Sequence, residues 1–331
     1  MTDPTGNSPI DQARKSKWRI RLLILLAAVV VLLAGTELFS RYYLGLGDPP
    51  LSMADPDTGY ISRPNQTCFR FGNTIHYNAY CMRSPDFPAH KSDPQEFRVM
   101  VLGNSIINGG AQTDQSQVCT SILQRALGDK LHRPVIVGNI SAGGWGPLNE
   151  WPYVKTRGLF DADVVVIVLN SNNAASRFPA GPVAGVDPSF PDHKPCCATW
   201  EAVTRYLPRY LPFLGPVGSN EGYHPAADDA LATAQSSDAL GNMIATARAH
   251  GAKAYVVLHW TLTELRQAAG EKSGWLPPRL QTIRAASQGA GATGIISDDA
   301  GAAPTDYRDD IHPNANGQRH LAALMLEQIA P

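Results

Sequence analysis

Apolar residues in most of this chain fall into short continuous runs separated by amphipathic stretches. The continuous runs predict buried β-strands at residues 97–102, 134–140, 162–170, 254–259 and 294–296. The amphipathic stretches predict α-helices at residues 115–127, 148–156, 228–250 and 278–288, and a last helix with Leu321, Leu324, Met325 and Ile329 on one face. Apolar strands that alternate with amphipathic helices predict an α/β domain, whose parallel sheet is covered by helices on both faces.

One apolar run near the N-terminus is too long for a strand. Residues 22–35 are apolar without interruption, and Leu38 and Phe39 extend the run beyond two polar positions. A helix over residues 20–39 has the roughly 17–25 residues that crossing a bilayer requires. Trp18 on one side and Tyr42 with Tyr43 on the other have the positions of interfacial anchors. This pattern predicts one transmembrane helix at residues 20–39.

The charges before this run predict its orientation. Five basic residues precede or begin it: Arg14, Lys15, Lys17, Arg19 and Arg21. The positive-inside rule therefore predicts a cytoplasmic tail at residues 1–19 and export of the rest. A cleaved signal peptide is the alternative, but cleavage after Ala34 or Gly35 puts leucine at position −3, where a small residue is preferred. The pattern favours an uncleaved signal anchor.

The remaining chain divides by composition. Residues 40–95 are rich in Pro, Asp and Asn and show little periodicity, which predicts an extension or stalk packed on the main domain at residues 96–331. Within that domain, residues 174–224 hold many prolines and glycines and no clear strand, so they are interpreted as an insertion that acts as a lid or binding loop or is disordered. The net charge of −1 gives no electrostatic reason to expect nucleic-acid binding. The oligomeric state stays open.

The five cysteines suit an exported protein. Cys68 and Cys81 flank a loop that a disulfide could close, which would stabilise the fold by about 3 kcal/mol. Cys119 shares a helical face with apolar residues and is expected to be buried. Cys196 and Cys197, with His193 nearby, suggest a metal site, but adjacent thiols rarely make a good tetrahedral pair. We therefore predict neither a metal nor a cofactor.

Candidate chemistry gathers where the predicted strands end. Ser105 follows the first strand, Gly144 ends a glycine-rich turn after the second, and Asn172 follows the third. Near the C-terminus come Asp309 or Asp310 and His312. Each could be an ordinary turn or cap residue. Together, at one edge of a parallel sheet, they provide a nucleophile, oxyanion donors and an oriented base, which favours acyl transfer.

The same residues lie in short motifs that resemble the SGNH/GDSL hydrolase superfamily. The quoted segments "VMVLGNSIINGG", "NISAGG", "VLNSNN" and "DDIHPNANG" are similar to four sequence blocks of that superfamily, in order, over residues 96–331. The resemblance implies a flavodoxin-like α/β/α sandwich. It implies a triad of Ser105, His312 and Asp309, and an oxyanion hole formed by Ser105, Gly144 and Asn172. Asparagine replaces the usual Asp, Gly and Asp at positions 104, 170 and 173.

The segment "GNTIHYNAYCMRSPDFP" resembles the region before the first block in membrane-anchored bacterial members. These resemblances predict a serine esterase, anchored in the bacterial inner membrane with its catalytic domain outside. Its expected substrates are O-acyl esters, foremost O-acetyl esters, on an envelope carbohydrate or lipid. Two alternatives stay open: an O-acyltransferase that acts on a polysaccharide, and an inactive anchored binding or scaffold protein.

Overall fold

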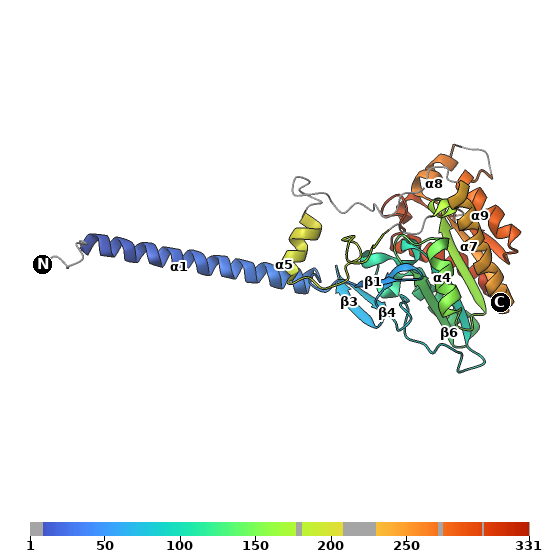
Figure 1. Cartoon of the computed structure of the whole chain (residues 1–331), viewed down its shortest axis with the longest axis horizontal. Coiled ribbons are helices and arrows are strands. Elements are labelled where there is room, and N and C mark those ends of the chain that lie inside the picture. Colours follow the sequence, from blue (N-terminus) through green and yellow to red (C-terminus); the bar gives the residue numbers. More distant parts are fainter. Residues whose placement is uncertain (1–8, 177–180, 208–229, 271–273, 300, 331) are drawn as a thin grey trace.

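A long helix projects from an α/β domain in the computed structural model of this chain (Figure 1). The structure describes residues 9–176, 181–207, 230–270, 274–299 and 301–330. The predicted tail therefore lies outside the described residues at 1–8, and the predicted insertion does so at 177–180 and 208–224. The long helix α1 is Pro9–Leu38, and a short π-helical turn, η1 (Phe39–Tyr43), continues it.

A five-stranded parallel sheet forms the centre of the domain. Its strands are β5 (Phe97–Gly103), β6 (Val135–Ser141), β7 (Val164–Asn170), β8 (Lys253–His259) and β9 (Gly294–Ser297). They lie in the order β6-β5-β7-β8-β9, and every neighbouring pair is parallel. β5 and β7 are buried along their whole length, because helices cover both faces of the sheet. All five predicted strands are thus present.

Helices cover the two faces of the sheet. One core cluster packs β-strand residues against α4 (Pro147–Arg157), α7 (Ala230–Ala249) and α9 (Pro278–Gly289). The other packs the alternate strand residues against α3 (Cys119–Leu131) and α10 (Ala315–Ile329). Cys119 is buried in this second cluster, as its helical face predicts. The result is the expected three-layer α/β/α sandwich.

The extension at residues 40–95 is more regular than its sequence indicates. It forms two antiparallel hairpins, β1 (Ser52–Asp55) with β2 (Gly59–Ser62), and β3 (Gln66–Arg70) with β4 (Asn73–Tyr77). Tyr60 and Ile61 of β2 join the same core cluster as α4 and α7. Strands of four or five residues are too short to show a clear alternation, which is why the pattern was missed.

The disulfide that Cys68 and Cys81 could form is absent from the structure, where both are free thiols. Cys68 is paired with Ile75 within the β3–β4 hairpin, whereas Cys81 lies in a turn with a left-handed φ of 64°. Both side chains are buried in this arrangement, and burial raises the pKa of each thiol to about 11.

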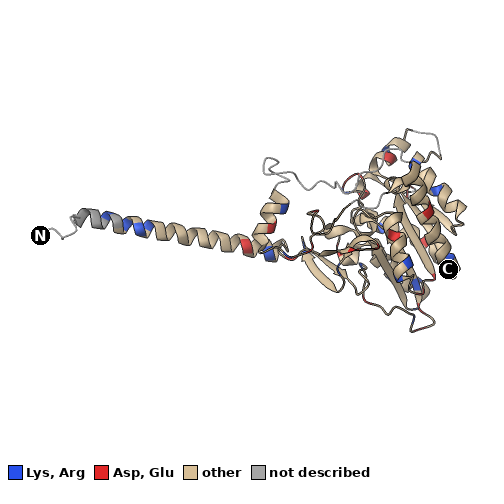
Figure 2. Cartoon of the chain, viewed as in Figure 1, with Lys and Arg blue, Asp and Glu red and all other residues tan. Residues whose placement is uncertain are grey.

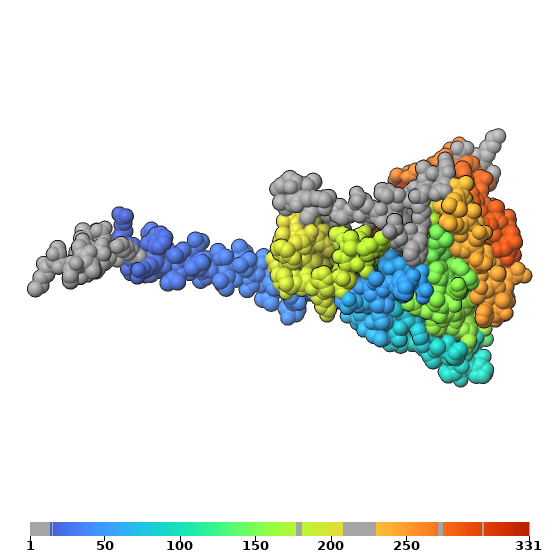
Figure 3. Space-filling view, viewed as in Figure 1, coloured from blue at the N-terminus to red at the C-terminus, as the bar shows by residue number. Residues whose placement is uncertain are grey.

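Several shorter helical segments lie between the strands and the main helices. α2 (Ser105–Asn108) follows β5, η4 (Ser171–Ala175) follows β7, and α8 (Leu262–Ala268) follows β8. In the predicted insertion, α5 (Ala198–Glu201) continues into a π-helical turn, η5 (Ala202–Tyr206). This segment packs against the domain end of α1, and it is the yellow helix of Figures 1 and 3.

Candidate active site

Ser105 begins a helix directly at the end of a buried strand. β5 ends at Gly103, and the side-chain oxygen of Asn104 accepts a hydrogen bond from the Ile106 backbone N–H at 3.0 Å. Asn104 therefore caps α2, whose first residue is Ser105. Since Asn104 supplies the cap, the Ser105 hydroxyl is left for another partner.

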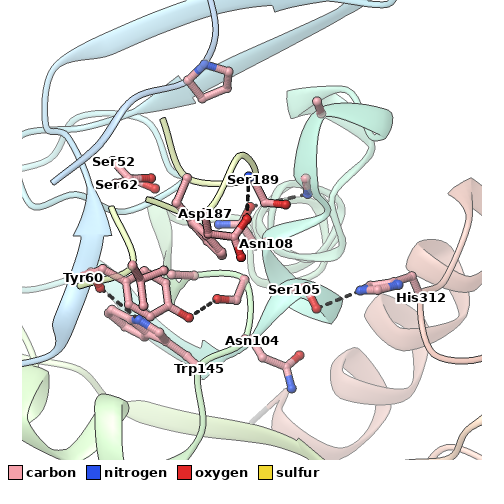
Figure 4. A pocket seen from close by; sticks show the side chains of 18 of the residues that line it. Ser52, Tyr60, Ser62, Asn104, Ser105, Asn108, Trp145, Asp187, Ser189 and His312 are labelled. Carbon is pink, nitrogen blue, oxygen red and sulfur yellow. Dashed lines mark hydrogen bonds between the residues drawn. The ribbon is translucent and has the colours of Figure 1, made fainter. Parts of the chain in front are cut away.

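That partner is His312. The Ser105 Oγ lies 2.8 Å from His312 Nε2, a contact that Figure 4 shows inside the pocket. On the other side of the ring, His312 Nδ1 lies 2.8 Å from Asp309 Oδ2. An acceptor at Nδ1 fixes the proton there, so Nε2 is free to accept the serine proton. The structure thus brings Ser105, His312 and Asp309 into one chain of hydrogen bonds.

The carboxylate of Asp309 is held in its charged form. Partial burial disfavours that charge, but Oδ1 accepts backbone N–H groups from Ile311 at 2.9 Å and His312 at 2.8 Å. Together with the His312 ring, these donors hold the pKa of Asp309 below its usual value. The alternative carboxylate, Asp310, instead accepts hydrogen bonds from Thr263. Its neighbour Asp309 is therefore the acid that orients the imidazole.

The imidazole of His312 is held in its neutral form. Burial lowers its pKa and outweighs the attraction of Asp309, while the positive charges of Arg308 and His259 lower it further. A lowered pKa keeps the ring neutral, and therefore able to accept a proton, in mildly acidic solution.

We expect this shift to appear in the pH dependence of ester turnover. If neutral His312 accepts the serine proton, kcat/KM should fall on the acid side with a midpoint below the ordinary histidine pKa of 6.5. The measurement is a pH profile of kcat/KM on an uncharged chromogenic ester. A midpoint above pH 7 would contradict the assignment. Asp309→Asn should move the midpoint lower still, since the attraction of Asp309 is the main influence that raises this pKa.

Polar groups suited to an oxyanion line the same pocket as Ser105. Gly144 has a left-handed φ of 74°, and a Cβ there would lie 2.9 Å from the Tyr60 hydroxyl. Asn172 in η4 lines the same pocket as Ser105, and its side-chain amide makes no hydrogen bond to another described residue. The N–H groups of Ser105 and Gly144 and this amide are therefore available donors near the hydroxyl.

The two asparagines that replace aspartates are bonded to each other. Asn104 donates its side-chain N–H to Asn173 Oδ1 at 3.1 Å, and the same oxygen accepts the Asn170 backbone N–H at 2.9 Å. The amide nitrogen of Asn173 in turn donates to the Trp145 carbonyl at 3.2 Å. Both side chains are buried. This network joins the ends of β5 and β7 to the glycine-rich turn without any charge.

Restoring the acid at the first position should therefore destabilise the protein. In Asn104→Asp, a carboxylate oxygen would face the Asn173 carbonyl oxygen, so a buried donor is replaced by an acceptor. We expect a loss of about 1–3 kcal/mol in the free energy of unfolding at neutral pH, measured by urea denaturation. Protonation of the new carboxyl restores a donor, so the loss should shrink in acid. Equal stability of the two proteins at pH 7 would show that the Asn104–Asn173 bond is unimportant.

The pocket around Ser105 has a volume of about 340 Å³ and walls from three parts of the chain. The α/β domain provides the base of the pocket, the extension provides Tyr60 and Tyr77, and the insertion provides Phe190 and Tyr206. The Tyr60 hydroxyl donates to the Gly143 carbonyl, and its ring packs edge-on against Phe190 at 4.7 Å between centroids. Figure 4 shows Tyr60 and Trp145 together at this wall.

Sequence reasoning missed two groups that support the site. Tyr60 lies 83 residues from Gly143, so no local signal could have linked them. His259 and Asp298, in contrast, each stand at or just after the end of a strand, where the same rule that indicated Ser105 applies. Their side chains are bonded to each other, and His259 Nε2 lies 2.8 Å from the carbonyl of Ile311, the residue before His312. Among the described residues, no group of three or more His, Cys, Asp or Glu side chains is arranged to hold a metal ion.

The sequence model of the GDSL-like Lipase/Acylhydrolase family matches residues 101–320, a range that includes Ser105 and His312. The chain belongs to this family, so the resemblance seen in the sequence is confirmed. It is accordingly a hydrolase that acts on ester bonds.

Solved structures of low sequence identity also resemble the chain. Axe2, an acetylxylan esterase from Geobacillus stearothermophilus, is 11% identical with a TM-score of 0.43, covering 71% of this chain and 94% of its own. The acetyl xylan esterase AlAXEase is 16% identical with a TM-score of 0.44, covering 70% and 100%. TesA is 17% identical with a TM-score of 0.38, covering 70% and 96%. Among curated proteins, none matches the chain significantly.

Proposed function

We propose that this protein is a membrane-anchored serine esterase that removes O-acyl groups, foremost O-acetyl groups, from an envelope carbohydrate or lipid. The observation that carries the proposal is the hydrogen-bonded series Ser105–His312–Asp309, which opens into a cavity of about 340 Å³. In the proposed reaction, Ser105 Oγ attacks the ester carbonyl carbon while His312 Nε2 takes the hydroxyl proton. Asp309 holds the ring and stabilises its positive form.

The tetrahedral intermediate carries a negative oxygen that needs donors. The backbone N–H groups of Ser105 and Gly144 and the side-chain amide of Asn172 are proposed to bind it, and each such donor typically lowers the barrier by about 2.7–4 kcal/mol. Collapse of the intermediate breaks the ester C–O bond, and His312 gives its proton to the leaving alcohol. Water then attacks the acyl-enzyme by the same steps and releases the acid.

The N-terminal helix supports the anchor. The span Ser16–Tyr43 is long and apolar enough to cross a membrane, and none of its most apolar 18-residue stretch is buried inside the protein. Figure 2 shows basic residues before the apolar stretch. Glu37 and Arg41 form an ion pair at its other end. By the positive-inside rule, the α/β domain lies on the outer side of the bacterial inner membrane. A signal sequence passes the same test of length and apolarity.

Transfer to a sugar hydroxyl is the second candidate. Walls from the extension and the insertion enclose the serine, which reduces access of water to an acyl-enzyme. An inactive scaffold is disfavoured, because the hydrogen-bonded series Ser105–His312–Asp309 is intact.

The proposal is tested with the purified full-length chain and an acetylated oligosaccharide. We expect free acetate to be released, and an organofluorophosphonate probe to label Ser105 alone, as mapped by peptide mass spectrometry. Acetyl groups found on an added acceptor glycan in place of free acetate would favour the transferase. Absence of turnover, transfer and labelling together would leave only the scaffold reading and refute the proposal.

A further inference from the structure

The short helix of the insertion is attached directly to the domain end of α1. The Glu37 carboxylate accepts hydrogen bonds from the backbone N–H groups of Ala198 at 3.0 Å and Thr199 at 2.8 Å. The Thr199 hydroxyl adds a third bond at 3.0 Å, and Arg41 binds the same carboxylate from within the anchor. These bonds therefore hold the first residues of α5 beside Glu37, near the domain end of α1.

The position of Glu37 is the edge of the bilayer if α1 spans it. Residues 20–39 rise about 30 Å as a helix, which equals the thickness of the hydrocarbon core. Arg21, near the start of this span, and Arg41, just beyond its end, suit the two interfaces. Figure 1 shows α5 crossing the end of α1 rather than continuing it. Residues 198–206 would therefore run along the membrane surface.

A helix on a membrane surface needs one side bound to the protein and one apolar side exposed to lipid, and residues 198–206 have both. On the side toward the domain, buried Glu201 pairs with Arg70 of β3 and accepts the Gly47 backbone N–H at 2.6 Å. On another side, Trp200 and Val203, three residues apart, are 56% and 44% exposed. The adjoining segment η1, which contacts α5, carries three more exposed aromatic residues: Phe39, Tyr42 and Tyr43. Tryptophan and tyrosine beside a spanning helix are typical of the interfacial aromatic belt.

We propose that residues 198–206 form an interfacial helix that rests on the lipid bilayer, with Trp200 and Val203 inserted at the headgroup boundary. The occupant of this apolar face is the bilayer itself, because the helix that carries the face is packed on the anchor that enters the bilayer. Figure 3 shows the segment, in yellow, at the junction of the anchor and the domain.

This placement narrows the substrate of the proposed esterase, and the step rests on the proposed function. Arg205 and Tyr206 lie on the interfacial helix and line the same pocket as Ser105. One wall of the pocket is thereby held at the membrane surface. The ester that reaches the serine is accordingly one carried on a membrane lipid, rather than on a glycan far from the bilayer.

Fluorescence quenching of the full-length chain in phosphatidylcholine vesicles tests the membrane contact. The vesicles carry lipids with a nitroxide at the headgroup. Trp18 and Trp200 should be quenched in the native chain, so Trp200→Phe should remove about half of the quenchable emission. Trp151→Phe, a change on α4 within the domain, should leave it unchanged. Equal quenching of the native chain and Trp200→Phe would overturn the proposal, provided that circular dichroism shows both to be folded.

A second measurement tests the substrate. Val203→Asp puts a charge on the membrane face, so the ratio of turnover of an acyl-ester lipid in vesicles to turnover of a soluble chromogenic ester should fall tenfold or more. An unchanged ratio would overturn the lipid substrate. Failure of the native chain to cleave either ester would refute the proposed function, whereas the quenching result would still decide the membrane contact.

Discussion

Ser105→Ala should reduce kcat/KM on a short-chain ester by about 10⁴–10⁶-fold, the scale seen when a triad serine is removed. The Ser105 hydroxyl lies 2.8 Å from His312 Nε2. In the proposed reaction it is the group that forms the acyl-enzyme, so its removal stops the first step. Labelling by an organofluorophosphonate should disappear as well. The measurements are steady-state kinetics and probe labelling of the purified full-length protein.

The loss should come from chemistry and not from unfolding. Asn104, rather than Ser105, caps α2, so the melting temperature of Ser105→Ala should match that of the native chain. Ser189 lines the same pocket and is a matched control, because Ser189→Ala removes a hydroxyl without touching His312. A Ser105→Ala protein that keeps a tenth of the activity, or a Ser189→Ala protein that loses all labelling, would exclude Ser105 as the nucleophile.

The sheet and the strand ends could be predicted from sequence because their signals are local. β5 and β7 are continuous apolar runs, and parallel strands bring their carboxyl ends to one edge whatever the connections are. Ser105 and His312, 207 residues apart in sequence, therefore meet. The motif resemblance indicates Asp309, and the structure adds the physical reason: backbone N–H groups of the turn bind Asp309, whereas Asp310 binds Thr263.

The pocket walls could not be predicted, because they depend on contacts between distant segments. The β1–β2 hairpin is short, and Tyr60 becomes part of the site only because β2 joins the core cluster that also includes α4 and α7. Likewise, α5 is held by Glu37, which lies 161 residues before its partner Ala198. No hydrophobic periodicity or sequence motif indicates which residues so far apart in the chain are in contact. The features that determine substrate access in this protein are consequently the ones that its sequence reveals least.

The buried pair of His259 and Asp298 leads to the second large effect. His259 Nδ1 faces the Asp298 carboxylate and Nε2 faces the Ile311 carbonyl, so both ring nitrogens have acceptors and the ring is held as a cation. Burial lowers the pKa of His259, but the Asp298 charge and these hydrogen bonds outweigh it and raise the pKa above the ordinary 6.5. This cation connects the ends of β8 and β9 to the loop that carries His312.

His259→Ala should therefore cost about 3–5 kcal/mol of unfolding free energy at pH 6, because it leaves the Asp298 carboxylate buried without its partner. The sign of the pH dependence follows from the raised pKa. The charged pair stabilises the fold fully below pH 6.5, and its contribution is lost as pH rises through the higher folded-state value. The difference between the native chain and His259→Ala should thus be largest near pH 6 and shrink in alkaline solution, as measured by urea unfolding.

Two further variants separate this charge effect from a simple loss of packing. His259→Gln keeps an N–H that can reach Asp298 but carries no charge, so it should lose less stability than His259→Ala and show no such pH dependence. In the double variant His259→Ala with Asp298→Ala, the loss should be smaller than the sum of the two single losses, because neither partner is then left buried alone. If the losses simply add, or if His259→Ala costs less than about 1 kcal/mol at pH 6, His259 is not a structural cation.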